Sequence, residues 1–98
     1  MVQLIKSATF DRWLTTLKDP QARARIAVRL DRLALGNPGD VKPIGSGISE
    51  LRIDYGPGYR VYFMRRGKKL IVLLCAGDKR TQAADIALAL SIAKDWRE

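Results

Sequence analysis

The chain of 98 residues is long enough for one domain and too short for two. Apolar residues make up 47% of it, which is sufficient for one core without disulfides, and 18 Lys/Arg against 10 Asp/Glu give a net charge of +8. There is no histidine, no cysteine or carboxylate cluster with metal-ligand spacing, and no phosphate-binding glycine loop. We therefore expect no metal and no cofactor, and any catalysis must use Arg, Lys, Tyr and a few carboxylates.

A short strand and a helix are predicted at the start of the chain. Residues 2–7 alternate between polar and apolar side chains, as a strand does. Ser7 or Thr9 then caps a helix that runs to about Lys18, by accepting a backbone N–H bond. The apolar side chains of this helix recur at the spacing of one helical stripe: Phe10, Trp13, Leu14 and Leu17.

A second helix follows at once and is predicted to form a hairpin with the first. Proline has no N–H and suits the first turn of a helix, so Asp19-Pro20 ends one helix and begins the next. The second helix extends to about Leu35, and Gly36 is placed as its C-terminal stop. Its buried stripe consists of Ala22, Ile26, Leu30 and Leu33. Residues 37–47 are rich in Gly and Pro and are predicted to be a loop.

The second half of the chain changes to the period of strands. Ile48–Asp54 and Tyr59–Arg66 alternate, and Lys69–Ala76 is continuously apolar, which predicts a three-stranded antiparallel meander whose last strand is the most buried. Residues 81–96 return to helical spacing, with one face formed by Ala83, Ile86, Ala87, Leu90 and Ala93. The predicted fold class is α+β: a single domain over residues 1–98, in the order β-α-α-β-β-β-α, with the N-terminal hairpin and the other helix on one face of the sheet.

Cysteine content and hydropathy indicate the compartment. Cys75 lies in the apolar strand, where we expect a core residue, and a single cysteine excludes an intrachain disulfide. The first ten residues lack the apolar segment of a signal peptide, and no stretch reaches the length of a membrane span. The expectation is a cytoplasmic protein without membrane contact.

Positive charge is concentrated in one part of the chain. Residues 52–80 hold two acidic side chains and eight basic ones: Arg52, Arg60, Arg65, Arg66, Lys68, Lys69, Lys79 and Arg80. Such a field suits a polyanion, because each neutralised phosphate releases condensed counterions. The alternatives are general solubility or a surface that meets an acidic protein partner. We favour contact with nucleic acid or the ribosome.

Strand parity predicts where the chemistry lies. Arg60 alternates with Tyr59 and Val61, and an unpaired charge is costly to bury, so we expect Arg60 on the sheet face that helices leave open, together with Arg52. Lys79 and Arg80 follow the last strand at its end, where functional side chains often lie.

Arginine, lysine and tyrosine suit one reaction well. When the 2′-hydroxyl of RNA attacks the adjacent phosphate, guanidinium groups can stabilise the charge that spreads over the phosphoryl oxygens. The reaction also requires that something align the RNA. The pattern is equally consistent with a purely solvated surface, in which the arginines pair with Glu50 or Asp54.

Three segments together resemble one known family. Glu50–Ile53 (ELRI), Gly58–Phe63 (GYRVYF) and Gly77–Gln82 (GDKRTQ) look like the HigB-like branch of the RelE/ParE toxin superfamily, and the similarity extends over essentially the whole chain. The resemblance implies a RelE-like fold and a type II toxin that is neutralised by a protein antitoxin, commonly of helix-turn-helix type. It further implies cleavage of mRNA in the ribosome, which would supply the alignment of the RNA.

The resemblance also assigns roles to residues. Arg60 matches the family's sheet arginine that contacts the scissile phosphate, and Lys79 and Arg80 match the basic pair after the last strand, so these three are the expected catalytic residues. The expected RNA-binding residues are Arg52, Arg65, Arg66, Lys68 and Lys69. Some relatives carry a catalytic tyrosine near the C-terminus, whereas this chain has none after Tyr62, so the proton acceptor is unassigned.

Two alternatives to an mRNA-cleaving toxin stay open. One is a non-enzymatic, ParE-like inhibitor of DNA gyrase with the same fold, and the other is a degenerate, non-toxic binding module. Retention of Arg60 with Lys79-Arg80 favours RNA cleavage over gyrase binding.

Overall fold

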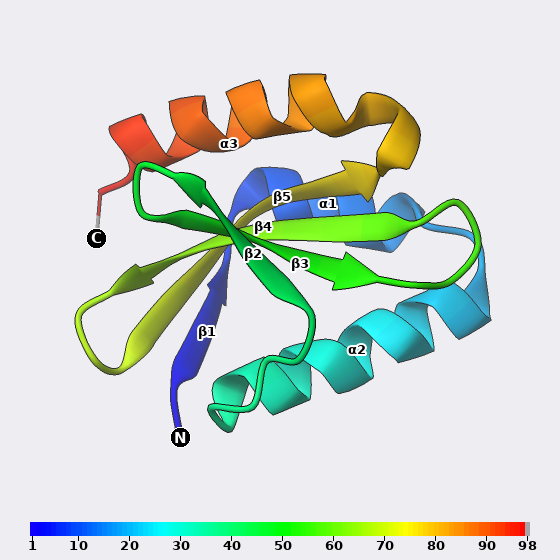
Figure 1. Cartoon of the computed structure of the whole chain (residues 1–98), viewed down its shortest axis with the longest axis horizontal. Helices are drawn as coiled ribbons and strands as arrows, with labels where there is room; N and C mark the ends of the chain where they lie inside the picture. Colours follow the sequence, from blue (N-terminus) through cyan, green and yellow to red (C-terminus); the bar gives the residue numbers. More distant parts are fainter. Residues whose placement is uncertain (98) are drawn as a thin grey trace.

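The strands form one mixed sheet in the order β1-β5-β4-β3-β2 (Figure 1). The structure is a computed structural model that describes residues 1–97. Its strands are β1 (Gln3–Lys6), β2 (Val41–Gly45), β3 (Ile48–Ile53), β4 (Tyr59–Arg66) and β5 (Leu70–Asp78). β1 pairs in parallel with β5, and the other neighbouring strands are antiparallel. The predicted meander is therefore present, with one further strand at each edge.

The predicted loop over residues 37–47 contains β2, so the predicted element order is one strand short. The observed order is β-α-α-β-β-β-β-α. β2 pairs with β3 as an edge strand, and a turn through Gly45, Ser46 and Gly47, all at positive φ, reverses the chain between them. Proline has no N–H and cannot donate a hydrogen bond to a neighbouring strand. Pro43 is tolerated in β2 because one side of this edge strand has no neighbouring strand to bond.

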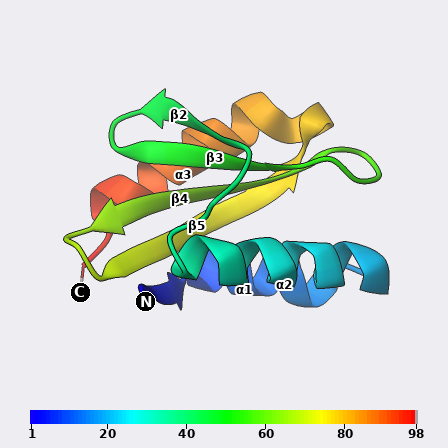
Figure 2. The ribbon, with the colours of Figure 1, turned by 60° about the horizontal axis from the view of Figure 1, so that its bottom comes forward.

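The predicted helical hairpin is confirmed as α1 (Ala8–Thr16) and α2 (Pro20–Ala34). Ser7 caps α1 by accepting the N–H of Phe10 at 2.9 Å, and Asp19 caps α2. Figure 2 shows the two helices side by side against one face of the sheet. The predicted stripe of α2 is buried there: Ala22, Ile26, Leu30 and Leu33.

The last helix, α3 (Gln82–Asp95), packs on the opposite face of the sheet (Figure 2), so the prediction that all helices share one face is wrong. Of the predicted face, Ile86 and Ala93 do pack against the sheet, beside Ala89, which is buried, and Ile92, neither of which was predicted. The predicted Ala83, Ala87 and Leu90 are exposed. Apolar side chains are spread around α3 and do not form one stripe, so its periodicity does not select one face.

Each face of the sheet carries its own core, because strand side chains alternate. On β4, Val61 and Phe63 pack under the hairpin, whereas Tyr62 packs under α3. Residues 71–77 of β5 are buried throughout, as predicted, and they include the free Cys75. Within residues 1–97, every helix is too short or too polar to cross a membrane.

Candidate functional site

Arg60 lies on the sheet face that α3 covers, and this corrects the expectation of an open face. Its side chain is only 12% exposed. Nε lies 3.4 Å from Oε2 of Glu50, which is an ion-pair distance, yet neither Nε nor Nη1 forms a hydrogen bond within residues 1–97. Arg60 is therefore a nearly buried cation, and its counterion is Glu50, which the sequence offered as a partner together with Asp54.

Glu50 joins Arg60 to a buried polar network. The Glu50 side chain is 1% exposed, and its Oε2 accepts hydrogen bonds from Tyr62 Oη at 3.0 Å and from Gln82 Nε2 at 2.8 Å. Burial of the phenol, together with its hydrogen bond to Glu50, raises the pKa of Tyr62 far above its usual value. Tyr62 is consequently a protonated donor at neutral pH. The network holds the Arg60 guanidinium in place, which electrostatic catalysis requires of a cation.

Gly77 allows α3 to begin this close to the site. Gly77 pairs with Arg60 across β5 and β4, and a Cβ at Gly77 would lie only 1.8 Å from Oδ2 of Asp85 in α3. The Thr81 hydroxyl donates a hydrogen bond to the same Asp85 carboxylate. A side chain at position 77 would overlap the Asp85 and Thr81 side chains and displace them from their mutual hydrogen bond.

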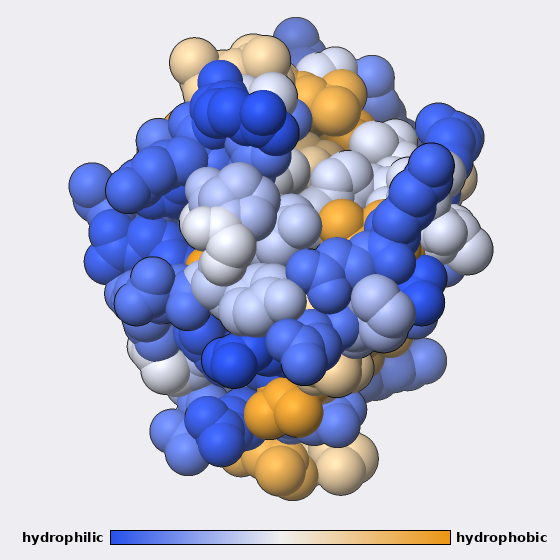
Figure 3. Space-filling model, turned by 90° about the vertical axis from the view of Figure 1, so that its right-hand side faces the viewer, coloured by the Kyte–Doolittle hydropathy of each residue, from blue (hydrophilic) through white to orange (hydrophobic). Residues whose placement is uncertain are grey.

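Three of the predicted site residues line one hollow at the end of the sheet. Arg52 and Arg60 are direct cross-strand partners, and Lys79 follows β5, with its aliphatic chain near Gly58. The hollow has a volume of about 250 Å³, and we call it the Arg60 hollow; its lining residues are Asp40, Arg52, Ile53, Asp54, Gly58, Tyr59, Arg60 and Lys79. It opens toward the end of the molecule where the β3–β4 turn and the start of α3 lie, and Figure 3 shows that end to be largely hydrophilic.

Arg52 and Arg80 each form an ion pair with an aspartate. Arg52 Nη2 lies 2.8 Å from Oδ1 of Asp40, and both side chains are partly exposed. Arg80, in the 3₁₀ turn η1 (Lys79–Thr81), lies outside the lining residues, and its Nη2 is 3.0 Å from Oδ2 of Asp78. The Arg80 guanidinium hydrogen bond lowers the pKa of Asp78 below its ordinary value. The structure thus groups Arg52, Arg60 and Lys79, and leaves Arg80 beside them.

Tyr59 lines the hollow, although strand parity places it opposite to Arg60. Tyr59 is the first residue of β4 and lies at the end of the sheet, so it lines the hollow although it also packs against the core under α1 and α2. Its ring packs edge-on against Trp13, with a centroid separation of 5.9 Å. The Tyr55 hydroxyl donates to Asp19 at 2.9 Å, so it points away toward α2. The sequence signal that could have identified Tyr59 as a site residue is its position at the start of the predicted strand.

The other predicted RNA-binding residues lie at the opposite end of β4. Arg65 and Arg66 end that strand, and Lys68 and Lys69 lie in the turn before β5; all four are exposed. Arg60 and Arg66 are six residues apart on β4, which corresponds to about 20 Å at the rise of a strand. We call this second group (Arg65, Arg66, Lys68 and Lys69) the hairpin cluster. The sequence-predicted cations therefore form two separate surfaces.

Comparison with known proteins finds relatives over nearly the whole chain. The family model described as "Phage derived protein Gp49-like (DUF891)" matches residues 12–95, which include every residue that lines the Arg60 hollow. A protein of Haemophilus influenzae is 48% identical over 94 residues, covering 96% of this chain and 95% of that protein.

Proposed function

The chain belongs to the phage-derived Gp49-like family, a family associated with toxin–antitoxin systems, and we propose that it is the toxin of such a pair. Its proposed activity is endonucleolytic cleavage of mRNA during translation, in the manner of the HigB-like branch of the RelE/ParE superfamily. The observation that carries the proposal is the Arg60 hollow, where two arginines, a lysine and a tyrosine converge. A cognate antitoxin, the ribosome and mRNA are the proposed partners.

The proposed reaction is attack by the RNA 2′-hydroxyl on the adjacent phosphate. The 2′-oxygen forms a bond to phosphorus and loses its proton, and the 5′-oxygen leaves and gains one, which produces a cyclic phosphate end and a 5′-hydroxyl end. At about 30 Å³ per water, the hollow holds roughly eight waters, enough for a phosphate and part of a ribose. The ribosome would hold the RNA in the in-line geometry.

The lining residues divide the work of this reaction. Arg60, fixed by Glu50, stabilises the charge on the phosphoryl oxygens. The Lys79 ammonium donates the proton to the departing 5′-oxygen, and the proton that leaves the 2′-oxygen passes through the Tyr59 hydroxyl to solvent water. Arg52 binds the RNA backbone from the rim, while Arg80, outside the hollow, contacts a flanking phosphate.

The first experiment expresses the chain from a repressed promoter without its neighbouring gene and maps the 5′ ends of mRNA shortly after induction. We expect cuts inside translated codons for the unmodified chain and for the control Arg12→Ala, because Arg12 is exposed on α1 and does not line the hollow. Arg60→Ala should abolish the cuts. Circular dichroism of each purified variant shows whether its fold is retained.

Lys79→Ala is the second variant, because the exposed Lys79 can be removed without disturbing the core. Loss of a general acid predicts cleavage slower by about 10²–10⁴-fold, with an unchanged fold. Growth arrest with intact mRNA in every strain would refute the proposed reaction and favour a gyrase-type target. Expression without any arrest would instead indicate a non-toxic binding module.

A further inference from the structure

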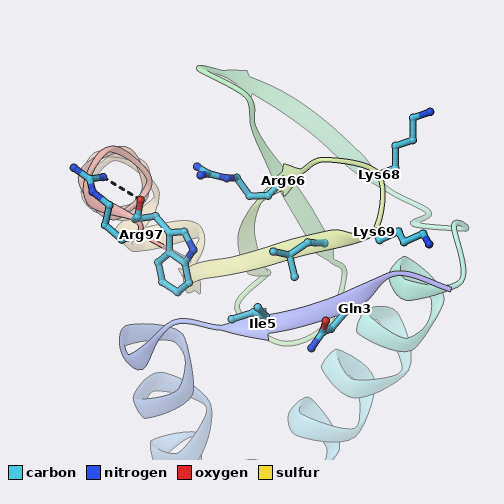
Figure 4. Close-up of a pocket in the computed structure, with 8 residues that line it drawn as sticks. Gln3, Ile5, Arg66, Lys68, Lys69 and Arg97 are labelled. Carbon is cyan, nitrogen blue, oxygen red and sulfur yellow. Dashed lines mark hydrogen bonds between the residues drawn. The ribbon is translucent and has the colours of Figure 1, made fainter.

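A second hollow lies where the β4–β5 turn, β1 and the end of α3 meet (Figure 4). Its volume is about 730 Å³, which is within the range of about 300–1,000 Å³ typical of ligand-binding clefts. None of its lining residues also lines the Arg60 hollow. We call it the C-terminal hollow.

The polar lining of the C-terminal hollow is strongly cationic. Arg66, Lys68 and Lys69 of the hairpin cluster line it, together with Arg97, and no carboxylate is among the described residues that do so. Figure 4 shows that Arg66 extends toward the end of α3, where Arg97 lies, whereas Lys68 and Lys69 extend outward on the other side. Positive charge therefore lies at both ends of this hollow.

The rest of the lining is apolar and includes an aromatic ring. Ile5, Leu70 and Trp96 are each half-buried there. Nε1 of Trp96 is buried and has no hydrogen-bond partner within residues 1–97. Buried donors without a partner are rare in folded proteins, so this N–H indicates a polar group that residues 1–97 do not provide.

The positive charge continues beyond the C-terminal hollow. Arg66 also lines a neighbouring hollow of about 520 Å³, to which Arg65 and Lys94 contribute and where the described lining again contains no carboxylate. A path of basic side chains thus leads from one hollow to the next. A continuous cationic path fits a polymer with regularly spaced negative charges better than it fits a single small anion.

We propose that the C-terminal hollow binds a nucleotide of a single-stranded nucleic acid, with the base against Trp96 and Leu70 and the backbone phosphates on Arg97 and Lys69. Aromatic and apolar surface beside a cationic groove is the combination that binds unpaired nucleotides, because every base has a face that stacks and every phosphate a charge. An acidic peptide would use the cations and leave the apolar lining unused. This binding is separate from RNA cleavage and stands without it, because Arg60 is about 20 Å away along β4.

The first test measures how the binding of fluorescein-labelled oligouridylate depends on salt, by fluorescence anisotropy. In the double variant Lys69→Gln/Arg97→Gln two phosphate contacts are lost, so the slope of log K against log salt should become shallower by about 1.4, at about 0.7 per contact for a single strand. The matched control is Arg12→Gln/Lys18→Gln, which removes the same charge from exposed positions on α1 and the link after it. The control should keep the original slope.

The second test uses the indole itself. The chain has two tryptophans, so in Trp13→Phe the fluorescence comes from Trp96 alone. Titration with unlabelled oligouridylate should quench this fluorescence as the base stacks. Trp96→Phe keeps an aromatic ring and removes the N–H, so we expect about five-fold weaker binding with an unchanged salt slope, the equivalent of one lost hydrogen bond.

The outcomes separate this proposal from its competitors and from cleavage. Equal slope changes in the test and control pairs would show that only net charge matters and would overturn the proposal, as would the absence of Trp96 quenching.

Oligothymidylate in place of oligouridylate tests whether the hollow prefers RNA or DNA. Equal binding would show that it accepts both kinds of single strand, and weaker binding of oligothymidylate would show that it is specific for RNA. If the test pair loses oligoglutamate binding and keeps oligouridylate binding, the occupant is an acidic protein segment and the proposal is wrong. In the Trp13→Phe background, Arg60→Ala should keep the quenching of Trp96 by oligouridylate, whether or not the chain cleaves mRNA, because Arg60 does not line the C-terminal hollow.

Discussion

Removal of the Glu50 carboxylate should destabilise the fold far more than removal of an exposed carboxylate beside the same site. Glu50→Ala leaves the Tyr62 hydroxyl and the Gln82 amide without their acceptor and Arg60 without its counterion. Hydrogen bonds to a charged group contribute about 1.5–3 kcal/mol each, and breaking a buried ion pair on one side costs about 3–5 kcal/mol. We therefore expect a loss of about 3–5 kcal/mol in the free energy of unfolding.

The assay is urea unfolding followed by circular dichroism, with thermal unfolding as a second measure. For a domain of this size a loss of 3 kcal/mol lowers Tm by about 12–24 °C. The control is Asp40→Ala, which breaks the solvent-exposed ion pair with Arg52 in the same hollow and should leave Tm almost unchanged.

A double-mutant cycle shows whether the ion pair with Arg60 causes the destabilisation that follows removal of the Glu50 charge. Glu50→Gln keeps the size of the side chain and removes its charge, so it should be destabilising in the unmodified chain. In the Arg60→Met background it should cost less or become stabilising, because an unpaired buried carboxylate is then neutralised. Additivity of the two changes within about 0.5 kcal/mol would refute the coupling inferred from the 3.4 Å separation of Arg60 and Glu50.

Three further predictions concern the start of α3 and the core. Gly77→Ala should lower the free energy of unfolding by about 1–3 kcal/mol, because the new Cβ would clash with Asp85, and urea unfolding measures this; an unchanged midpoint would contradict the packing described. Burial raises the pKa of the Cys75 thiol to about 12, so a thiol reagent at mildly alkaline pH should react only after denaturant is added, and rapid labelling of the native protein would be the contrary result. The Arg80 guanidinium lowers the pKa of Asp78, so the stabilisation from this pair is present above the ordinary carboxyl pKa of 3.8 and is lost as pH falls through the lowered value. Arg80→Ala should raise the pKa of Asp78 in an NMR titration, and an unmoved titration would show that the contact does not persist in solution.

Elements with a strong local signal were predictable from the sequence. The stripe of α2 is buried as predicted, since its apolar residues recur at three- or four-residue intervals and Asp19-Pro20 and Gly36 mark the ends of the helix. The alternation along β4 correctly placed Tyr62 and Arg60 together, because successive side chains of a strand point to opposite faces wherever the strand lies.

Elements whose identity or placement depends on the segment they pack against were not predictable in this way. β2 is five residues with a proline and a terminal glycine, which locally resembles a loop, and it becomes a strand because β3 offers an edge to pair with. The periodicity of α3 likewise does not show on which side of the sheet it packs, because apolar side chains are spread around the helix, at nine of its 14 positions. That choice decided that Arg60 is nearly buried beside Glu50 and not on an open surface.

The sequence by itself determined which side chains are available for chemistry: a surplus of arginine and lysine, three tyrosines and no histidine. Only the tertiary structure decided how these side chains are grouped. Arg52, Arg60, Lys79 and Tyr59 converge on one hollow because the ends of β3, β4 and β5 meet there, while the hairpin cluster is carried to the far end of β4. The physical reason is that charge and periodicity are local properties, whereas the covering of a sheet face depends on contacts between segments far apart in the chain.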